Sequence, residues 1–229
     1  MGDIAVQTFK EQVNYFVKAT GYRRVLLLAA LALVSSLLSN FCQFGSWKIL
    51  QATFLHGNDL AAPILPGIYF GAVLAVGAYA WKRKSLFAAC VILFSTVIAW
   101  VVAWECAYNT VGHLNDLCKN AAAEPLLGPN TLRIILFLFG GIAGGFVGGL
   151  ITLVGISIAI SEVGTINNWW RTLFVASFAG TALGYYGYDG GSFILLFVVW
   201  QVAVAASIAF GWSFKETWKT ASPLRARRR

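Results

Sequence analysis

Six apolar runs determine the fold class of this 229-residue chain, because each is long enough to cross a membrane as a helix. None contains an acidic or basic residue. Each is about 17–27 residues long, and a helix needs about 20 to cross the hydrocarbon of a bilayer. The runs are roughly Val25–Phe44, Leu60–Trp81, Ser85–Trp104, Ile134–Ile160, Thr172–Tyr188 and Phe193–Trp212. Since a backbone in lipid must satisfy its own hydrogen bonds, we predict an all-α integral membrane protein with a six-transmembrane-helix bundle.

The overall composition agrees with this class. Charged residues make up 11% of the chain, against about 25% in ordinary soluble domains. We expect one membrane domain over residues 25–212, an N-terminal segment over 1–24 and a basic tail over 213–229. The first run has no small-residue cleavage site at its end, so a removable signal peptide is not expected.

Lysine and arginine placement predicts the orientation of the bundle. With six spans, fourteen of the 17 basic residues fall on the side that holds both termini. The positive-inside rule assigns that side to the cytoplasm, so we expect both termini there, in a membrane such as the bacterial cytoplasmic membrane. The net charge of +8 then suits anionic lipids of the inner leaflet. No nucleic-acid partner is expected, because no nucleic-acid-binding fold accompanies the basic tail.

The segment before the first run has its own pattern. Ile4, Phe9, Val13, Phe16 and Val17 recur at helical spacing, with polar residues between them. The pattern predicts an amphipathic helix on the cytoplasmic interface. The alternative is a cytoplasmic extension of the first span that packs on its neighbours.

A ladder of glycines in the fourth run predicts close helix packing. A spacing of four places Gly140, Gly144 and Gly148 on one stripe, and Gly141, Gly145 and Gly149 on the adjacent stripe. Without side chains, two helix backbones approach closely, which favours association in lipid. The partner is either another span of this chain, such as the fifth run with its Ala179, Gly180 and Gly184, or a second subunit. A homo-oligomer and a partner membrane subunit therefore both remain open.

The outer segment 105–131 is predicted to be a loop that carries two cysteines. Cys106 and Cys118 would face an oxidising compartment, so they are the candidate disulfide, with Cys42 as a competing partner. Cys90 is interpreted as a small buried residue. A thiol oxidoreductase usually carries a Cys-x-x-Cys pair, and the chain has none.

Candidate cavity residues are few, and no catalytic or metal-binding residue is predicted. His56 and His113 fall in predicted outer loops without a ligand spacing. Pro63 and Pro66 mark either a helix start or a broken half-helix lining a cavity, and Gln201 is a polar residue within the sixth run. The sequence does not identify a cofactor.

Two function classes follow from these features. The first is a passive channel or permease-like component for a small uncharged or apolar solute; ion coupling is disfavoured, because the spans hold no charged residue or histidine. The second is a non-catalytic accessory or structural subunit of a membrane complex. An outer-face thiol redox protein is a further alternative, and an enzyme is not expected.

Overall fold

The described part of the chain is 93% helical and contains no strand, which confirms the all-α prediction. The computed structural model describes residues 11, 14–16, 18–44, 61–82, 85–120, 128–160, 166–185 and 193–221. Its helices are α2 (Tyr22–Phe44), α4 (Ala61–Trp81), α5 (Leu86–Asn120), α7 (Pro129–Ala159), α8 (Ile166–Gly180) and α10 (Ile194–Ala221).

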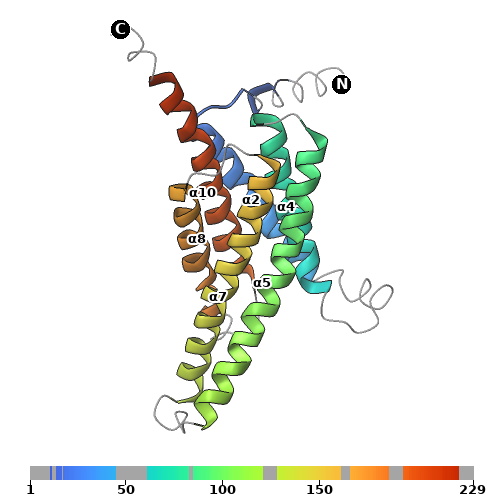
Figure 1. Cartoon of the computed structure of the whole chain (residues 1–229). Coiled ribbons are helices and arrows are strands. Elements are labelled where there is room, and N and C mark those ends of the chain that lie inside the picture. The colour runs from blue at the N-terminus through green and yellow to red at the C-terminus, as the bar shows by residue number, and fades with distance from the viewer. Residues whose placement is uncertain are drawn as a thin grey trace.

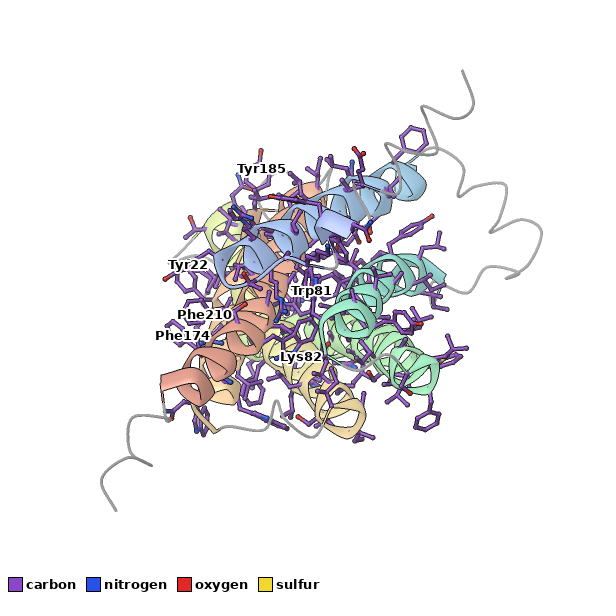
Figure 2. The ribbon with its side chains drawn as sticks, turned by 90° about the horizontal axis from the view of Figure 1, so that it is seen from above. Tyr22, Trp81, Lys82, Phe174, Tyr185 and Phe210 are labelled. Carbon is purple, nitrogen blue, oxygen red and sulfur yellow. The ribbon has the colours of Figure 1, made fainter. Side chains whose placement is uncertain are left out.

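The six helices form a closed bundle in chain order. Each helix packs on the next one along the chain, and α10 returns to pack on α2 (Figure 1). Successive helices alternate in direction, so α2 begins and α10 ends at the same end of the bundle. The view along the bundle places Trp81 towards the middle, while Tyr22, Phe174 and Tyr185 lie at the periphery (Figure 2).

Five of the helices are long and apolar enough to cross a membrane, so the chain is a polytopic membrane protein by length and composition. The predicted count of six spans is not confirmed, because α8 has 15 residues. Its length is about 22 Å, at about 1.5 Å per residue, against about 30 Å of hydrocarbon. The helix ends at Gly180, and Thr181–Tyr185 continue as a tighter turn with bonds such as Gly184 N–H to the Thr181 carbonyl at 2.8 Å.

The predicted outer loop is wrong over most of its length. Helix α5 runs on to Asn120, which gives it 35 residues, and α7 begins at Pro129. The polar residues of this stretch had suggested a loop, but Glu105, His113 and Asp116 lie on the exposed face, whereas the buried Ala107 packs on α7. The α5 and α7 helices therefore extend together beyond the rest of the bundle (Figure 1).

The predicted Cys106–Cys118 disulfide is also wrong, for the same reason. Both residues lie on α5, and both are free thiols, as is Cys90. Twelve positions along a helix separate them by about 18 Å, and a disulfide requires Cα atoms closer than about 7 Å. Cys90 is exposed on the bundle surface, so its predicted burial is wrong too. The side chain of Cys42 lies outside the described part of the chain.

The described residues just before α2 pack on the end of the bundle where α2 starts. Nε1 of Trp81 donates a hydrogen bond to the Phe16 carbonyl at 2.8 Å, and the two rings lie 4.7 Å apart. The chain then turns at Gly21, whose φ of 53° suits glycine, and Nε of Arg24 bonds back to the Ala19 carbonyl at 2.6 Å. The predicted interfacial helix is not confirmed, because most of its apolar positions lie outside the described residues.

Candidate functional site

One stripe of the glycine ladder packs against α5. A Cβ added to Gly144 would lie 2.7 Å from the Ala103 carbonyl oxygen, and one added to Gly140 would lie 2.9 Å from that of Ala107. Gly148 meets the Ala103 Cβ at 3.0 Å in the same way. Distances this short leave no space for a side chain, so α5 and α7 approach backbone to backbone.

The second stripe packs against α8. A Cβ added to Gly141 would overlap the Gly180 carbonyl, and one added to Gly145 would overlap the Ala176 carbonyl. Gly149 meets the Ala176 Cβ, at 2.7 Å from an added Cβ. The ladder therefore holds α7 between two helices of the same chain, and both of its stripes are used.

A cavity lies where the ladder meets α5, α8 and α10. Its volume is about 50 Å³, and it is partly open to the outside. The lining residues are Ala99, Trp100, Ala103, Trp104, Ala107 and Tyr108 from α5; Gly141, Gly144, Gly145 and Gly180; and Leu183, Leu196 and Trp200. A water molecule needs about 10–15 Å³ measured in this way, so the space would hold several water-sized groups.

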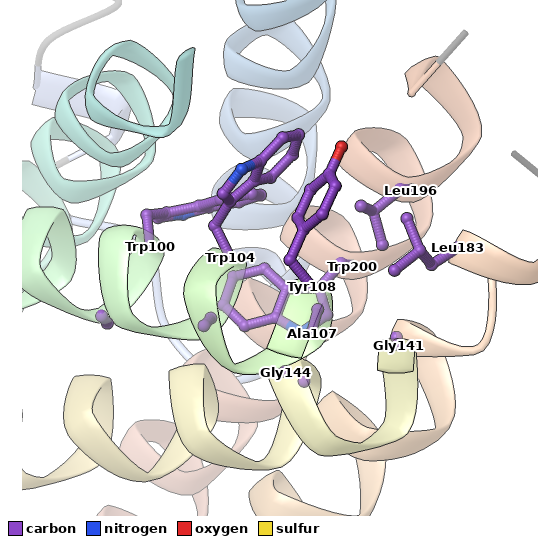
Figure 3. A pocket seen from close by; sticks show the side chains of 13 residues that line it. Trp100, Trp104, Ala107, Tyr108, Gly141, Gly144, Leu183, Leu196 and Trp200 are labelled. Atoms are coloured by element: carbon purple, nitrogen blue, oxygen red, sulfur yellow. The ribbon is translucent and has the colours of Figure 1, made fainter. Parts of the chain in front are cut away.

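Aromatic side chains form the wall of this cavity opposite the leucines (Figure 3). Trp100, Trp104 and Tyr108 are four residues apart on α5, so they line one face of it. The Trp100 ring meets that of Trp200 edge to face, with centroids 5.1 Å apart and planes at 71°. Trp200 in turn contacts Phe70 on α4 at 5.5 Å. These contacts fix the wall and fill the middle of the bundle beside the cavity.

The chemistry of the lining is apolar. No lining residue is charged, and nearly all the exposed lining atoms are carbon. Nε1 of Trp100 has no hydrogen-bond partner among the described residues, but it is buried and has almost no surface that a ligand in the cavity could touch. Such a site can bind an apolar group, but it offers no acid–base pair for chemistry.

Gln201, the polar residue predicted to line a cavity, does not line this one. Gln201 is fully buried and joins α10 to α2: Oε1 accepts bonds from Ser35 at 2.8 Å and Ser36 at 3.1 Å. Its Nε2 donates a longer bond of 3.4 Å to Ser39. Pro66 is buried inside α4, and the side chain of Pro63 lies outside the described part. Neither Gln201 nor Pro66 lines the cavity.

Arg171 and His113 are two polar residues that do not line the cavity. On α8, Arg171 donates to the Ser207 carbonyl at 2.9 Å and lies 4.5 Å from the centre of the Phe210 ring. On α5, His113 is exposed on the projecting part, while His56 lies outside the described residues. The described residues contain no group of three potential metal ligands.

The spacing of small and aromatic residues on α5 is a sequence signal for the cavity. Ala99, Ala103 and Ala107 have the same four-residue spacing as the glycines they meet. Next to them runs the aromatic stripe of Trp100, Trp104 and Tyr108. A stripe of small residues beside a stripe of aromatic residues indicates a tight helix contact with a rigid wall at its edge.

Comparison of the chain with protein-family models, curated proteins and solved structures gives no match.

Proposed function

We propose that this polytopic membrane protein binds an apolar molecule, or the end of an alkyl chain, in the cavity between α5, α7, α8 and α10. We further propose that such binding serves a passive, permease-like role in handling an apolar solute. The observation that carries the proposal is the combination of an apolar lining with a rigid aromatic wall and a partly open side. Apolar pockets of this kind bind apolar ligands by excluding water.

An open pore is a less suitable form of this function. Phe70, Trp100 and Trp200 meet across the bundle next to the cavity, and Phe197 packs on Trp100 at 5.6 Å. A solute that crossed the membrane by this route would have to displace these rings. Exchange between the cavity and the surrounding lipid needs no such rearrangement.

The membrane arrangement that we propose has six helices, with α8 as a short sixth member, and both termini in the cytoplasm. Helix α8 lies between α7 and α10 and alternates with them in direction, which supports counting it with the bundle. The asymmetry of basic residues supports the orientation and contact with anionic inner-leaflet lipids, in a membrane such as the bacterial cytoplasmic membrane.

A photoreactive alkane tests the binding function. The purified protein in lipid nanodiscs is labelled with a diazirine-bearing alkane, and the modified residues are mapped by mass spectrometry. We expect enrichment at Trp104, Tyr108 and Leu196 over the lipid-facing residues Phe94 and Phe174, which are 66% and 72% exposed.

Two neighbouring leucines provide the matched variants for this test. Leu196→Phe fills the cavity, whereas Leu195→Phe adds the same ring at a residue that does not line it. Labelling of the cavity should fall several-fold in the first variant and stay unchanged in the second. The proposal would be contradicted if cavity residues and lipid-facing residues were labelled equally in the unsubstituted protein and in both variants.

A second candidate function is that of an accessory subunit. Trp170, Phe174 and Phe178 form an outward stripe on α8 and are 64%, 72% and 70% exposed. This exposed aromatic surface could pack on a partner membrane protein, and otherwise lipid covers it. Mass measurement after purification in mild detergent tests it. A stable complex with a second protein, lost on Phe174→Ala, would favour this function, and a monomer that retains labelling of the cavity would favour the first.

A further inference from the structure

We infer that the phosphate group of an anionic phospholipid binds at Arg171, between the start of α8 and the facing turns of α10. The site is separate from the apolar cavity, because Arg171 does not line it. Arg171 is half-buried against α10: its Nη2 donates a hydrogen bond to the Ser207 carbonyl at 2.9 Å, and its Nε lies 3.4 Å from the Ser207 hydroxyl. The guanidinium carbon also lies 4.5 Å from the centre of the Phe210 ring. These contacts hold the positive charge in place before any ligand arrives.

The charge of Arg171 has no counter-charge among the described residues. It makes no ion pair with them, and the acidic side chains that the structure describes, Glu11, Glu105 and Asp116, are exposed and lie on other segments. The remaining guanidinium nitrogen, Nη1, has no hydrogen-bond partner among the described residues and keeps accessible surface. A cation held against an apolar bundle is stabilised by an anion that bonds to it, and Nη1 is open to one.

A second donor lies beside the guanidinium. A Cβ added to Gly211 of α10 would lie 3.2 Å from Nη2 of Arg171 and 3.3 Å from Nδ2 of Asn168, so both nitrogen atoms lie close to one point over α10. The Asn168 amide has no hydrogen-bond partner among the described residues, and it too keeps accessible surface. The missing side chain at Gly211 therefore leaves room for two donors from α8. A guanidinium with a neighbouring amide is a donor set that suits phosphate oxygens.

The surroundings of Arg171 favour a lipid over a soluble anion. Arg171 lies about 8 Å along α8 from its first residue, Ile166, which is the headgroup level if α8 starts at the membrane surface, as in the arrangement proposed above. Phe174 and Phe178 follow Arg171 by three and seven residues, so they lie on the same face one and two turns deeper, and they are 72% and 70% exposed. Phe174 and Phe210 lie on the same side of the bundle (Figure 2). A lipid whose phosphate contacts Arg171 would lay its acyl chains over Phe174 and Phe178, whereas a free phosphate ion would leave them uncovered.

Lipid binding by the full-length protein tests the inference. The delipidated protein in a mild detergent is titrated with phosphatidylglycerol, and the bound lipid is measured by native mass spectrometry. Two comparison molecules separate the parts of the lipid: diacylglycerol with the same chains lacks the phosphate, and glycerol phosphate lacks the chains. We expect saturable binding of phosphatidylglycerol, and roughly tenfold or weaker binding of each comparison molecule, because each lacks one half of the contacts.

Two arginines provide the matched variants. Arg171→Gln removes the charge and the planar set of donors, so it should weaken phosphatidylglycerol binding roughly tenfold or more. Arg133 also lies near an aromatic ring, at 5.9 Å from the centre of Phe137, but it is exposed near the start of α7, at the other end of the bundle. Arg133→Gln should therefore bind the lipid as the unsubstituted protein does. Asn168→Leu, which leaves the contacts between Arg171 and α10 in place, should weaken binding several-fold, and it tests the site even if Arg171→Gln does not fold.

Melting temperatures distinguish a lipid site from a purely structural role of Arg171. Phosphatidylglycerol should raise the melting temperature of the unsubstituted protein and of Arg133→Gln, and should raise that of Arg171→Gln and Asn168→Leu much less. If Arg171→Gln lowered the melting temperature equally with and without the lipid, and left the lipid affinity unchanged, the inference would be overturned. Binding of glycerol phosphate as tight as that of the lipid would also overturn it, because the ligand would then be a soluble anion. Leu196→Phe should leave phosphatidylglycerol binding unchanged, so the apolar cavity and the phosphate site are tested separately.

Discussion

Gly180 lies outside the ladder but faces its backbone, because a Cβ added there would overlap the Gly141 carbonyl of α7. Gly180→Ala would place a methyl group against that backbone, and neither helix can move without disturbing α5 or α10. We expect a loss of about 1–3 kcal/mol in the free energy of unfolding. The measurement is unfolding by SDS from mixed micelles.

Gly112 of α5 provides the control for this substitution. A Cβ added there meets nothing within 4 Å, so Gly112→Ala tests helix propensity alone. We expect no loss, and a gain of up to about 1 kcal/mol. If Gly180→Ala and Gly112→Ala behaved alike, the close contact between α7 and α8 would be refuted.

The polar contacts of Gln201 can be removed by substituting leucine, which has a similar size. Gln201→Leu would remove the bonds to the three serines of α2 and leave Ser35 without its acceptor. Side-chain hydrogen bonds between membrane helices contribute about 0.6 kcal/mol on average, so we expect a loss of about 1–2 kcal/mol. Val199→Leu, at a position that is 37% exposed on the same helix, should be neutral in the same SDS titration.

At the scale of the elements, α5 makes the most specific prediction. Because Cys106 and Cys118 lie on one continuous helix, spin labels at the two positions should give a single narrow distance distribution. Its centre should be near the helical separation of about 18 Å, within the reach of the labels. Both thiols should also react with an alkylating reagent before any reduction. A linked peptide pair, or a broad distribution typical of a loop, would be inconsistent with the extended helix.

The sequence predicted the apolar part of each element better than its ends. The runs Val25–Phe44 and Leu60–Trp81 match α2 and α4 closely, because polar residues bound them on both sides. The end of α5 was missed, since the polar face of its last turns has the composition of a loop. The partner that stabilises those turns is α7, which is distant in sequence, so no local pattern reveals it.

The cavity was missed for a different reason. Its walls are apolar residues that, taken singly, look like ordinary membrane core. The glycine ladder was identified, but which helix each stripe meets depends on the order of the bundle. Gln201 was a candidate because it is polar within an apolar run, yet such a residue bonds more readily to a neighbouring helix than to a ligand.

For the whole molecule, the alternation of six helices predicts which residues share a side of the membrane. Single cysteines at Thr20 and Arg225, in a cysteine-free background, should react with an impermeant reagent only from the cytoplasm. A cysteine at His113, on the projecting part of α5, should react only from outside. Reaction of the Thr20 and Arg225 positions from opposite sides would mean that α8 does not cross, which leaves five spans.

The shortness of α8 has a consequence for the lipid around the protein. In the six-span arrangement that we propose, a helix about 22 Å long beside neighbours that span about 30 Å would create a hydrophobic mismatch on one side of the bundle. The bilayer would then have to thin there, which would draw lipid chain ends towards Phe174 and Phe178 and towards the turn that carries Leu183 at the cavity. We therefore expect a higher melting temperature in nanodiscs of short-chain lipids than in those of long-chain lipids. A melting temperature that does not vary with chain length would show that the membrane is not deformed at α8.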